Sequence, residues 1–108
     1  MYAVIFEVEI KTEEMEAYLK IASELRKELN QVDGFISIER FQSLANQDKL
    51  VSLSFWETEE AIANWRNNIQ HRKAQQKGRS KLFSDYRLRV ARVVRDYGLN
   101  RREQAPKD

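Results

Sequence analysis

The residues best able to do chemistry lie close together in the second half of the chain. Trp65 and His71 are six residues apart in a stretch with helical character, and His71 is the only histidine among 108 residues. Histidine titrates near neutral pH, so His71 is the natural candidate for a base in a proton transfer. Two plainer interpretations remain open. His71 lies among polar residues that suit a helix end, and the spacing of Trp65 from Ile62 is typical of a core residue.

The composition argues against several other kinds of site. The chain has no cysteine, which rules out disulfides, a thiol nucleophile and a thiolate metal centre. A single histidine, with no carboxylate cluster at ligand spacing, predicts no metal site. The three glycines are isolated, so the sequence contains no glycine-rich phosphate loop. No apolar run approaches the ~20 residues of a membrane span, and the N-terminal stretch does not read as a signal peptide. The sequence therefore predicts a cytoplasmic protein that does not bind membranes.

Charge is unevenly distributed along the chain, although the net charge is only +2. Residues 1–65 hold 6 Lys/Arg and 13 Asp/Glu, whereas residues 66–102 hold 12 Lys/Arg and 2 Asp/Glu. Such asymmetry can indicate nucleic-acid binding. The basic half, however, has no recognisable nucleic-acid module and few aromatic side chains on which bases could stack. We therefore predict that the two halves neutralise each other within the fold or across a dimer.

Hydrophobic patterning of the first half predicts a strand, a helix and a hairpin. Residues 2–10 alternate between apolar and polar faces in the manner of a half-buried strand. Apolar residues then recur at helical spacing over residues 15–29, and Thr12 is the predicted N-cap. Residues 35–42 and 50–56 alternate again around a polar turn, which predicts two antiparallel strands.

The second half continues with a helix and a strand. Thr58 is the predicted N-cap of the helix. The pattern blurs at residues 67–68, which predicts a break there and a second helical piece that runs to about residue 77, with Gly78 as the predicted C-cap. Residues 82–95 read as a long final strand, with Tyr86, Leu88 and Val90 on one face. Its alternation slips near residues 93–94, which predicts a bulge there.

The order strand, helix, strand, strand, helix, strand predicts an α+β, ferredoxin-like fold with an antiparallel four-stranded sheet. Residues 1–98 form one domain in this interpretation, and residues 99–108 form a polar, flexible tail. Two helices would cover one face of the sheet and leave apolar side chains on the other. That second face predicts a homodimer in which two sheets pack together as a dimeric α+β barrel.

Several local motifs occur together in this chain. They are Asp-Gly-Phe at residues 33–35, Trp-Glu-Thr-Glu-Glu-Ala-Ile at 56–62, Trp65, His71, and the stretch from Gly-Arg at 78–79 to Tyr-Arg-Leu-Arg-Val at 86–90. With these motifs, residues 2–97 resemble the antibiotic biosynthesis monooxygenase family. Its members are dimeric α+β barrels and include quinol monooxygenases and haem-degrading enzymes.

The resemblance implies a monooxygenase that uses O2 and no cofactor to oxidise a phenolic or quinol-like aromatic molecule. Such a substrate must lose a proton, because its anion reduces oxygen far more readily than the neutral form. The site then needs a base, hydrogen-bond donors for the anion and a dry apolar pocket. His71 is the expected base, with Trp65 as its catalytic partner. The residues expected to bind substrate are Phe6, Phe35, Phe41, Asn68 and Tyr86.

Two subgroups of the family differ from this chain at their polar positions. The haem-degrading members use an asparagine on the first strand, where this chain offers Phe6. They also use a haem-ligating histidine at the position that Gln75 occupies here. The polyketide-oxidising members use an asparagine where this chain has Ala61 and a tyrosine where it has His71. The sequence thus predicts no haem, and it leaves open a non-catalytic ligand-binding or stress-related dimer of the same fold.

Overall fold

The computed structural model describes the backbone of residues 1–75 and 83–107 and the side chains of residues 1–68 and 84–107. The elements follow the predicted order. They are β1 (Tyr2–Ile10), a short 3-10 helix η1 (Thr12–Glu14), α1 (Met15–Leu29), β2 (Phe35–Gln42), β3 (Lys49–Trp56), α2 (Glu59–Gln75) and β4 (Phe83–Arg92).

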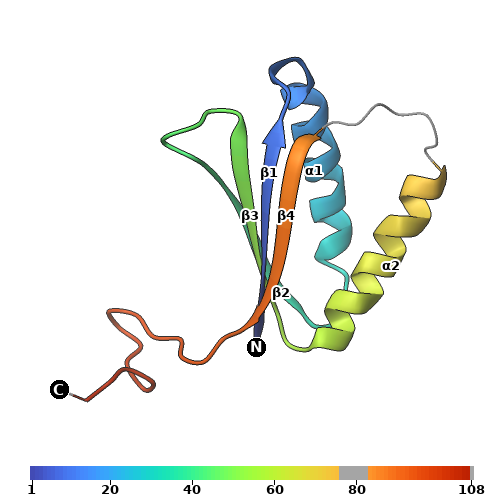
Figure 1. The fold of residues 1–108 in the computed structure, drawn as a ribbon. Helices are drawn as coiled ribbons and strands as arrows, with labels where there is room; N and C mark the ends of the chain where they lie inside the picture. The colour runs from blue at the N-terminus through green and yellow to red at the C-terminus, as the bar shows by residue number, and fades with distance from the viewer. Residues whose placement is uncertain (76–82, 108) are drawn as a thin grey trace.

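The four strands form one antiparallel sheet in the order β2-β3-β1-β4. Figure 1 shows both helices on the same side of this sheet. The arrangement confirms the predicted α+β, ferredoxin-like fold. It makes β1 and β3 the central strands and leaves β2 and β4 as the two edges.

The helix side of the sheet holds the core in two clusters. The first joins Val8, Ile10 and Leu50 from the strands to Tyr18 and Ala22 from α1. The second is formed by Leu29 of α1, Trp56 of β3 and Ala61 of α2. Strand alternation produces this face, because every second residue of β1 and β3 points toward the helices.

The other side of the sheet, which we call the open face, mixes apolar and charged side chains. Val51, Leu53 and Phe55 of β3 and Ile5 of β1 are only partly buried there. Glu7 of β1 pairs with Val51 and lies on the same face. The apolar part of this face agrees with the expectation that a second layer covers it.

The two helices cover the sheet unequally. Tyr18, Ala22 and Leu29 of α1 are buried, whereas the buried residue of α2 among its described side chains is Ala61. In Figure 1, α2 begins beside the end of β3 and then runs away from the sheet. No helix in the described part of the chain is long and apolar enough to cross a membrane.

The first helix begins differently from the prediction. Residues 12–14 form the 3-10 helix η1 and α1 starts at Met15, with no side-chain cap on either element. The Thr12 hydroxyl instead donates to the Asp48 carboxylate in the β2–β3 turn, at 3.2 Å. Thr12 as an N-cap was therefore wrong, because this threonine ties η1 to the turn.

The second helix begins where the sequence predicts, but it is continuous where a break was predicted. The Thr58 hydroxyl accepts a hydrogen bond from the Ala61 backbone N–H at 3.1 Å, which confirms this cap. The helix then continues through residues 67–68 to Gln75. The predicted interruption was wrong, because asparagine lowers helix stability only modestly. The proposed C-cap, Gly78, lies outside the described residues.

The last strand is shorter than predicted. Arg92 of β4 pairs with Tyr2, the first residue of β1, so the strand has no neighbour to pair with beyond that point. The backbone N–H of Val93 makes one last bond to the Met1 carbonyl, at 3.0 Å. The irregularity in this ladder lies between Glu9 and Ile10 of β1, so a bulge at residues 93–94 was wrong.

Candidate functional site

An exposed apolar wall lies on the helix side of the β4 edge. Tyr86, Leu88 and Val90 alternate along β4 and are 62%, 51% and 45% exposed. Phe6 of β1 pairs directly with Leu88, and its ring centroid lies 5.8 Å from that of Tyr86. We call Phe6, Tyr86, Leu88 and Val90 the β4 wall. An exposed apolar surface on the face that otherwise holds the core is typical of a binding site.

The described part of α2 adds one aromatic residue and several polar ones. Trp65 is partly buried and packs against the second core cluster, while Asn64, Asn67 and Asn68 are exposed. Residue 71 belongs to the same helix, three residues beyond Asn68. The side chain of His71 lies outside the part of the chain that the structure describes. Helical spacing therefore places residue 71 about one turn further along α2 than Asn68.

The other predicted aromatic residues separate into two groups. Phe35 packs edge-on against Trp56, with ring centroids 5.3 Å apart and an interplanar angle of 74°. It thereby joins the same cluster as Trp65. Phe41 pairs with Val51 on the open face, opposite the helices, and is 46% exposed. The fold thus brings Phe6 to Tyr86 and packs Phe35 and Trp65 against one core cluster, whereas Phe41 lies on the other side of the sheet.

The prediction did not include two members of the β4 wall, Leu88 and Val90. Their alternation with Tyr86 was visible in the sequence and correctly put the three on one face. Alternation alone, however, cannot tell a buried face from an exposed one. The signal that assigns them to a site is their exposure on the helix side of an edge strand.

Charged residues of the two halves of the chain meet on the open face. Arg89 donates a hydrogen bond to the Glu7 carboxylate at 3.1 Å, and the Lys49 ammonium lies 4.0 Å from the same carboxylate. The Arg89 hydrogen bond, with a smaller contribution from Lys49, lowers the pKa of Glu7 below its usual value. Glu7 and Arg89 belong to the acidic and basic halves of the sequence, so the halves do neutralise each other at this point.

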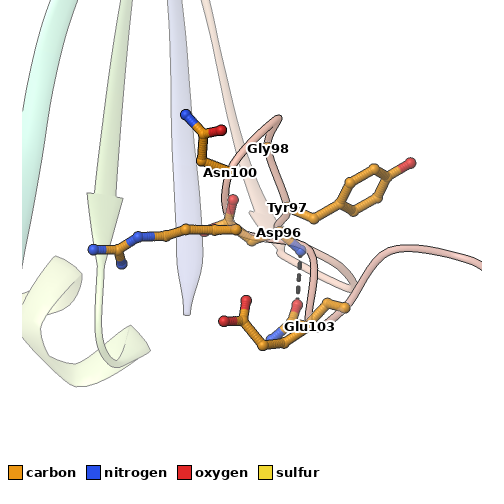
Figure 2. A pocket seen from close by; sticks show the side chains of 7 residues that line it. Asp96, Tyr97, Gly98, Asn100 and Glu103 are labelled. Atoms are coloured by element: carbon orange, nitrogen blue, oxygen red, sulfur yellow. Dashed lines mark hydrogen bonds between the residues drawn. The ribbon is translucent and has the colours of Figure 1, made fainter.

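Two hollows lie away from the β4 wall. One, of about 360 Å³, is lined by residues of α1, β2 and β3: Arg26, Ser37, Ile38, Glu39, Leu53 and Phe55. The other, of about 620 Å³, lies in the C-terminal segment between Asp96 and Gln104, and its lining residues are shown in Figure 2. Within the described residues, no three His, Cys, Asp or Glu side chains are grouped so that they could hold a metal ion.

Comparison with known proteins identifies the class to which this fold and wall belong. The sequence profile of the antibiotic biosynthesis monooxygenase family matches residues 1–77. The chain therefore belongs to the antibiotic biosynthesis monooxygenase family.

Two curated relatives are similar over most of this chain. Jasmonate monooxygenase ABM of Pyricularia oryzae is 44% identical over 94 residues, which are 87% of this chain but only 44% of that protein. The uncharacterised protein YqjZ of Bacillus subtilis is 32% identical over 94 residues, covering 87% of this chain and 80% of YqjZ. The chain thus spans less than half the length of the jasmonate monooxygenase.

The solved structures support the same fold. The haem degrader MhuD of Mycobacterium tuberculosis, with two haems in its active site, superposes with a TM-score of 0.69. The match covers 91% of this chain and 100% of MhuD, at 18% sequence identity. At this identity the likeness shows a shared fold and nothing about the ligand.

Proposed function

We propose that this chain is a monooxygenase that oxidises a small, largely apolar molecule with O2 at the β4 wall. The observation that carries the proposal is the exposed row of Tyr86, Leu88 and Val90 beside the Phe6 ring. Family membership and the 44% identity to a jasmonate monooxygenase support an oxygenase. A phenolic or quinol-like molecule is the substrate class that we favour, because a flat ring suits a wall built around two aromatic side chains.

The proposed reaction begins with removal of a proton from the substrate hydroxyl. The resulting anion transfers an electron to O2, and the radical pair combines inside an apolar environment. For a hydroquinone, the sum is hydroquinone plus O2 giving a hydroxyquinone plus water. The substrate itself supplies the electrons that reduce the second oxygen atom. We therefore propose a reaction without a bound cofactor.

Five of the seven predicted site residues have a role in this proposal. His71 of α2 is the base, and Asn68, one turn before it, donates a hydrogen bond to the substrate anion. Trp65 closes the end of the site next to the second core cluster. Phe6 and Tyr86 bind the substrate ring. We do not assign substrate contact to Phe41, which lies on the opposite face.

A second substrate class is favoured by one specific finding. The jasmonate monooxygenase relative is 44% identical, so a cyclopentanone with an apolar chain is an alternative occupant of the β4 wall. Haem degradation is not our proposal. Here the first strand offers Phe6 where the resemblance to haem degraders requires an asparagine, and the likeness to MhuD is one of fold.

The test is oxygen uptake with hydroquinones, anthrone-like phenols and jasmonic acid, using the wild type, His71→Ala and Leu44→Ala. Leu44 is fully exposed in the β2–β3 turn and serves as the matched control. We expect uptake above the spontaneous rate that falls by about 10²-fold or more in His71→Ala and is unchanged in the control. Uptake that is equal in wild type and His71→Ala would contradict the role of His71. Stoichiometric binding with no uptake would replace the oxygenase by a ligand-binding protein.

A further inference from the structure

A charged residue continues the β4 wall along its strand. Arg92 follows Val90 by two residues and pairs with Tyr2, the first residue of β1. Side chains alternate between the two faces of a strand, so the register puts Arg92 on the helix side of the sheet, in line with Val90. The wall therefore ends in a cation, at the end of the sheet where β1 begins.

Charge is rare on the helix side of the sheet. Among the strand residues whose side chains the structure describes, the register puts only Arg40 of β2 and Arg92 of β4 there as charged residues. Arg40 pairs with Ser52 at the opposite edge, so β3 and β1 separate it from the β4 wall. Arg92 is thus the strand cation that a molecule lying on the wall would meet.

The arginines of β4 differ in their partners. Arg89 donates a hydrogen bond to the Glu7 carboxylate on the open face at 3.1 Å, and the charge of Arg87 also lowers the pKa of Glu7. The Arg92 side chain is exposed, and it forms no ion pair or hydrogen bond with any side chain in the described part of the chain. The sequence of residues 69–83 contains no Asp or Glu. The N–H donors of Arg92 therefore remain for an external anion.

The backbone around Arg92 is held by hydrogen bonds, and a phenol lies next to it. Arg92 is in the ladder with β1, and the backbone N–H of Val93 donates to the Met1 carbonyl at 3.0 Å. Directly opposite residues of an antiparallel pair have Cβ atoms about 5 Å apart, so the Tyr2 hydroxyl is a second donor near the same point. A guanidinium on a fixed strand suits a carboxylate, which it can bind through two parallel N–H···O bonds.

We propose that Arg92 binds a carboxylate of the substrate, with Tyr2 as the second donor. The β4 wall then selects an amphipathic acid, which has a reacting ring at Phe6 and Tyr86, an apolar linker and a terminal carboxylate. This inference rests on the proposed function and adds an anionic group to the molecule proposed there. Arg92 lies four residues beyond Leu88, which is about 13 Å along a strand, so a linker of several carbons would join the two ends.

The first measurement compares two probes, a hydroquinone that carries a hexanoic acid side chain and the methyl ester of the same compound. Their dissociation constants are measured by isothermal titration calorimetry without oxygen, so that no turnover occurs. We expect the wild type to bind the acid about 10-fold or more tightly than the ester, and Arg92→Gln to lose this preference. Arg87→Gln makes the same change of charge on the open face of the same strand, so it should keep the preference.

Three further readouts separate carboxylate binding from a structural role of Arg92. Arg92→Lys keeps the charge without the paired donors, so it should restore part of the preference that Arg92→Gln loses. Added salt should weaken binding of the acid and leave the ester unchanged. In oxygen uptake, Arg92→Gln should raise the KM of the acid by about 10-fold and change kcat by less than about 2-fold. Thermal unfolding of Arg92→Gln should match the wild type, because the side chain is exposed.

The outcomes distinguish this inference from the proposed function. Oxygen uptake together with equal binding of acid and ester would overturn the carboxylate site and support the oxygenase. A preference for the acid that survives in Arg92→Gln, or an acid that does not bind to the wild type, would also overturn the carboxylate site. A preference that depends on Arg92, found without oxygen uptake, would support the carboxylate site and contradict the oxygenase.

Discussion

Phe6 and Tyr86 bring rings from β1 and β4 together on the helix side of the sheet, with centroids 5.8 Å apart and planes tilted by 47°. Phe6 also packs against the first core cluster, whereas Tyr86 is 62% exposed. One ring is thus held by the core and supports the other, which faces outward. This relationship predicts that Tyr86 serves binding more than stability.

Tyr86→Ala should raise the KM of the substrate by about 10-fold, because removing one aromatic contact costs about one factor of ten in affinity. The free energy of unfolding should change by less than about 1 kcal/mol, since the side chain is mostly exposed. Steady-state kinetics and thermal unfolding measure the two effects. Tyr86→Phe, which keeps the ring, is the control and should retain a near-normal KM. An equal loss in both variants would assign the effect to the hydroxyl and contradict a role in ring packing.

Gly34 connects α1 to β2 with a backbone φ of +86°, and a Cβ atom there would lie 2.7 Å from the Cβ of Ala61. Gly34→Ala combines a disfavoured conformation with a clash against a buried residue of α2. We expect a loss of about 2–4 kcal/mol in the free energy of unfolding. Chemical denaturation of Gly34→Ala and Gly98→Ala provides the comparison. Gly98 has no atom within 4 Å of the added Cβ, so a similar loss in both variants would refute the steric argument.

The fold was predictable because local signals and the global arrangement agree. Alternation in β1 and β3, together with the Thr58 cap, specified two strands and the start of α2. The end of β4 was not predictable from its own residues. It depends on β1 beginning at Tyr2, which pairs with Arg92. The continuity of α2 through two asparagines likewise reflects the weakness of helix propensity as a signal.

The candidate site was predictable only in its residue types. Alternation put Tyr86, Leu88 and Val90 on one face, but their exposure depends on how two distant elements, β4 and α2, are placed. Phe41 was placed in the predicted pocket for the same reason, its residue type. Its aromatic character suggested a pocket, whereas its register with Val51 puts it on the open face. Residue type alone does not reveal on which side of a sheet an aromatic ring lies.

Ser54 and Trp56 form a buried hydrogen bond on the helix side of β3, in which the indole N–H donates to the serine hydroxyl at 2.9 Å. Ser54→Ala would leave the N–H of a residue that is 2% exposed without this acceptor. We expect a loss of about 1–3 kcal/mol in the free energy of unfolding, measured by chemical denaturation. Ser37→Ala, at an exposed site of β2, should change it by less than about 0.5 kcal/mol. Trp56→Phe removes the indole N–H, so the same comparison is made in that background. If Ser54→Ala lowered the free energy of unfolding equally in both backgrounds, the Ser54–Trp56 hydrogen bond would not be the cause of the loss.

Glu7 should make the stability of the protein depend on pH in the acid range. The hydrogen bond from Arg89, and then the charge of Lys49, lower the pKa of Glu7 from its usual value of 4.5. A carboxylate with a lowered pKa in the folded state stabilises the protein above the unfolded value. That contribution is lost as the pH falls through the folded value, because both states then bind the proton. Stability should therefore fall on acidification from about pH 5, and it should fall less steeply in Glu7→Gln.

Urea denaturation at a series of acidic pH values measures this difference. As the matched control, the single variant Arg89→Gln is compared with the double variant Glu7→Gln/Arg89→Gln. Both variants lack the 3.1 Å hydrogen bond from Arg89 to Glu7. Without Arg89, the Glu7 substitution should change the pH slope much less than it does in the wild type. Added salt should also reduce the difference in pH slope between wild type and Glu7→Gln. Glu7 and Arg89 lie on the open face of the sheet, where salt screens the attraction between their charges. A pH slope that is identical in wild type and Glu7→Gln would show that the Glu7–Arg89 contact contributes nothing to acid sensitivity.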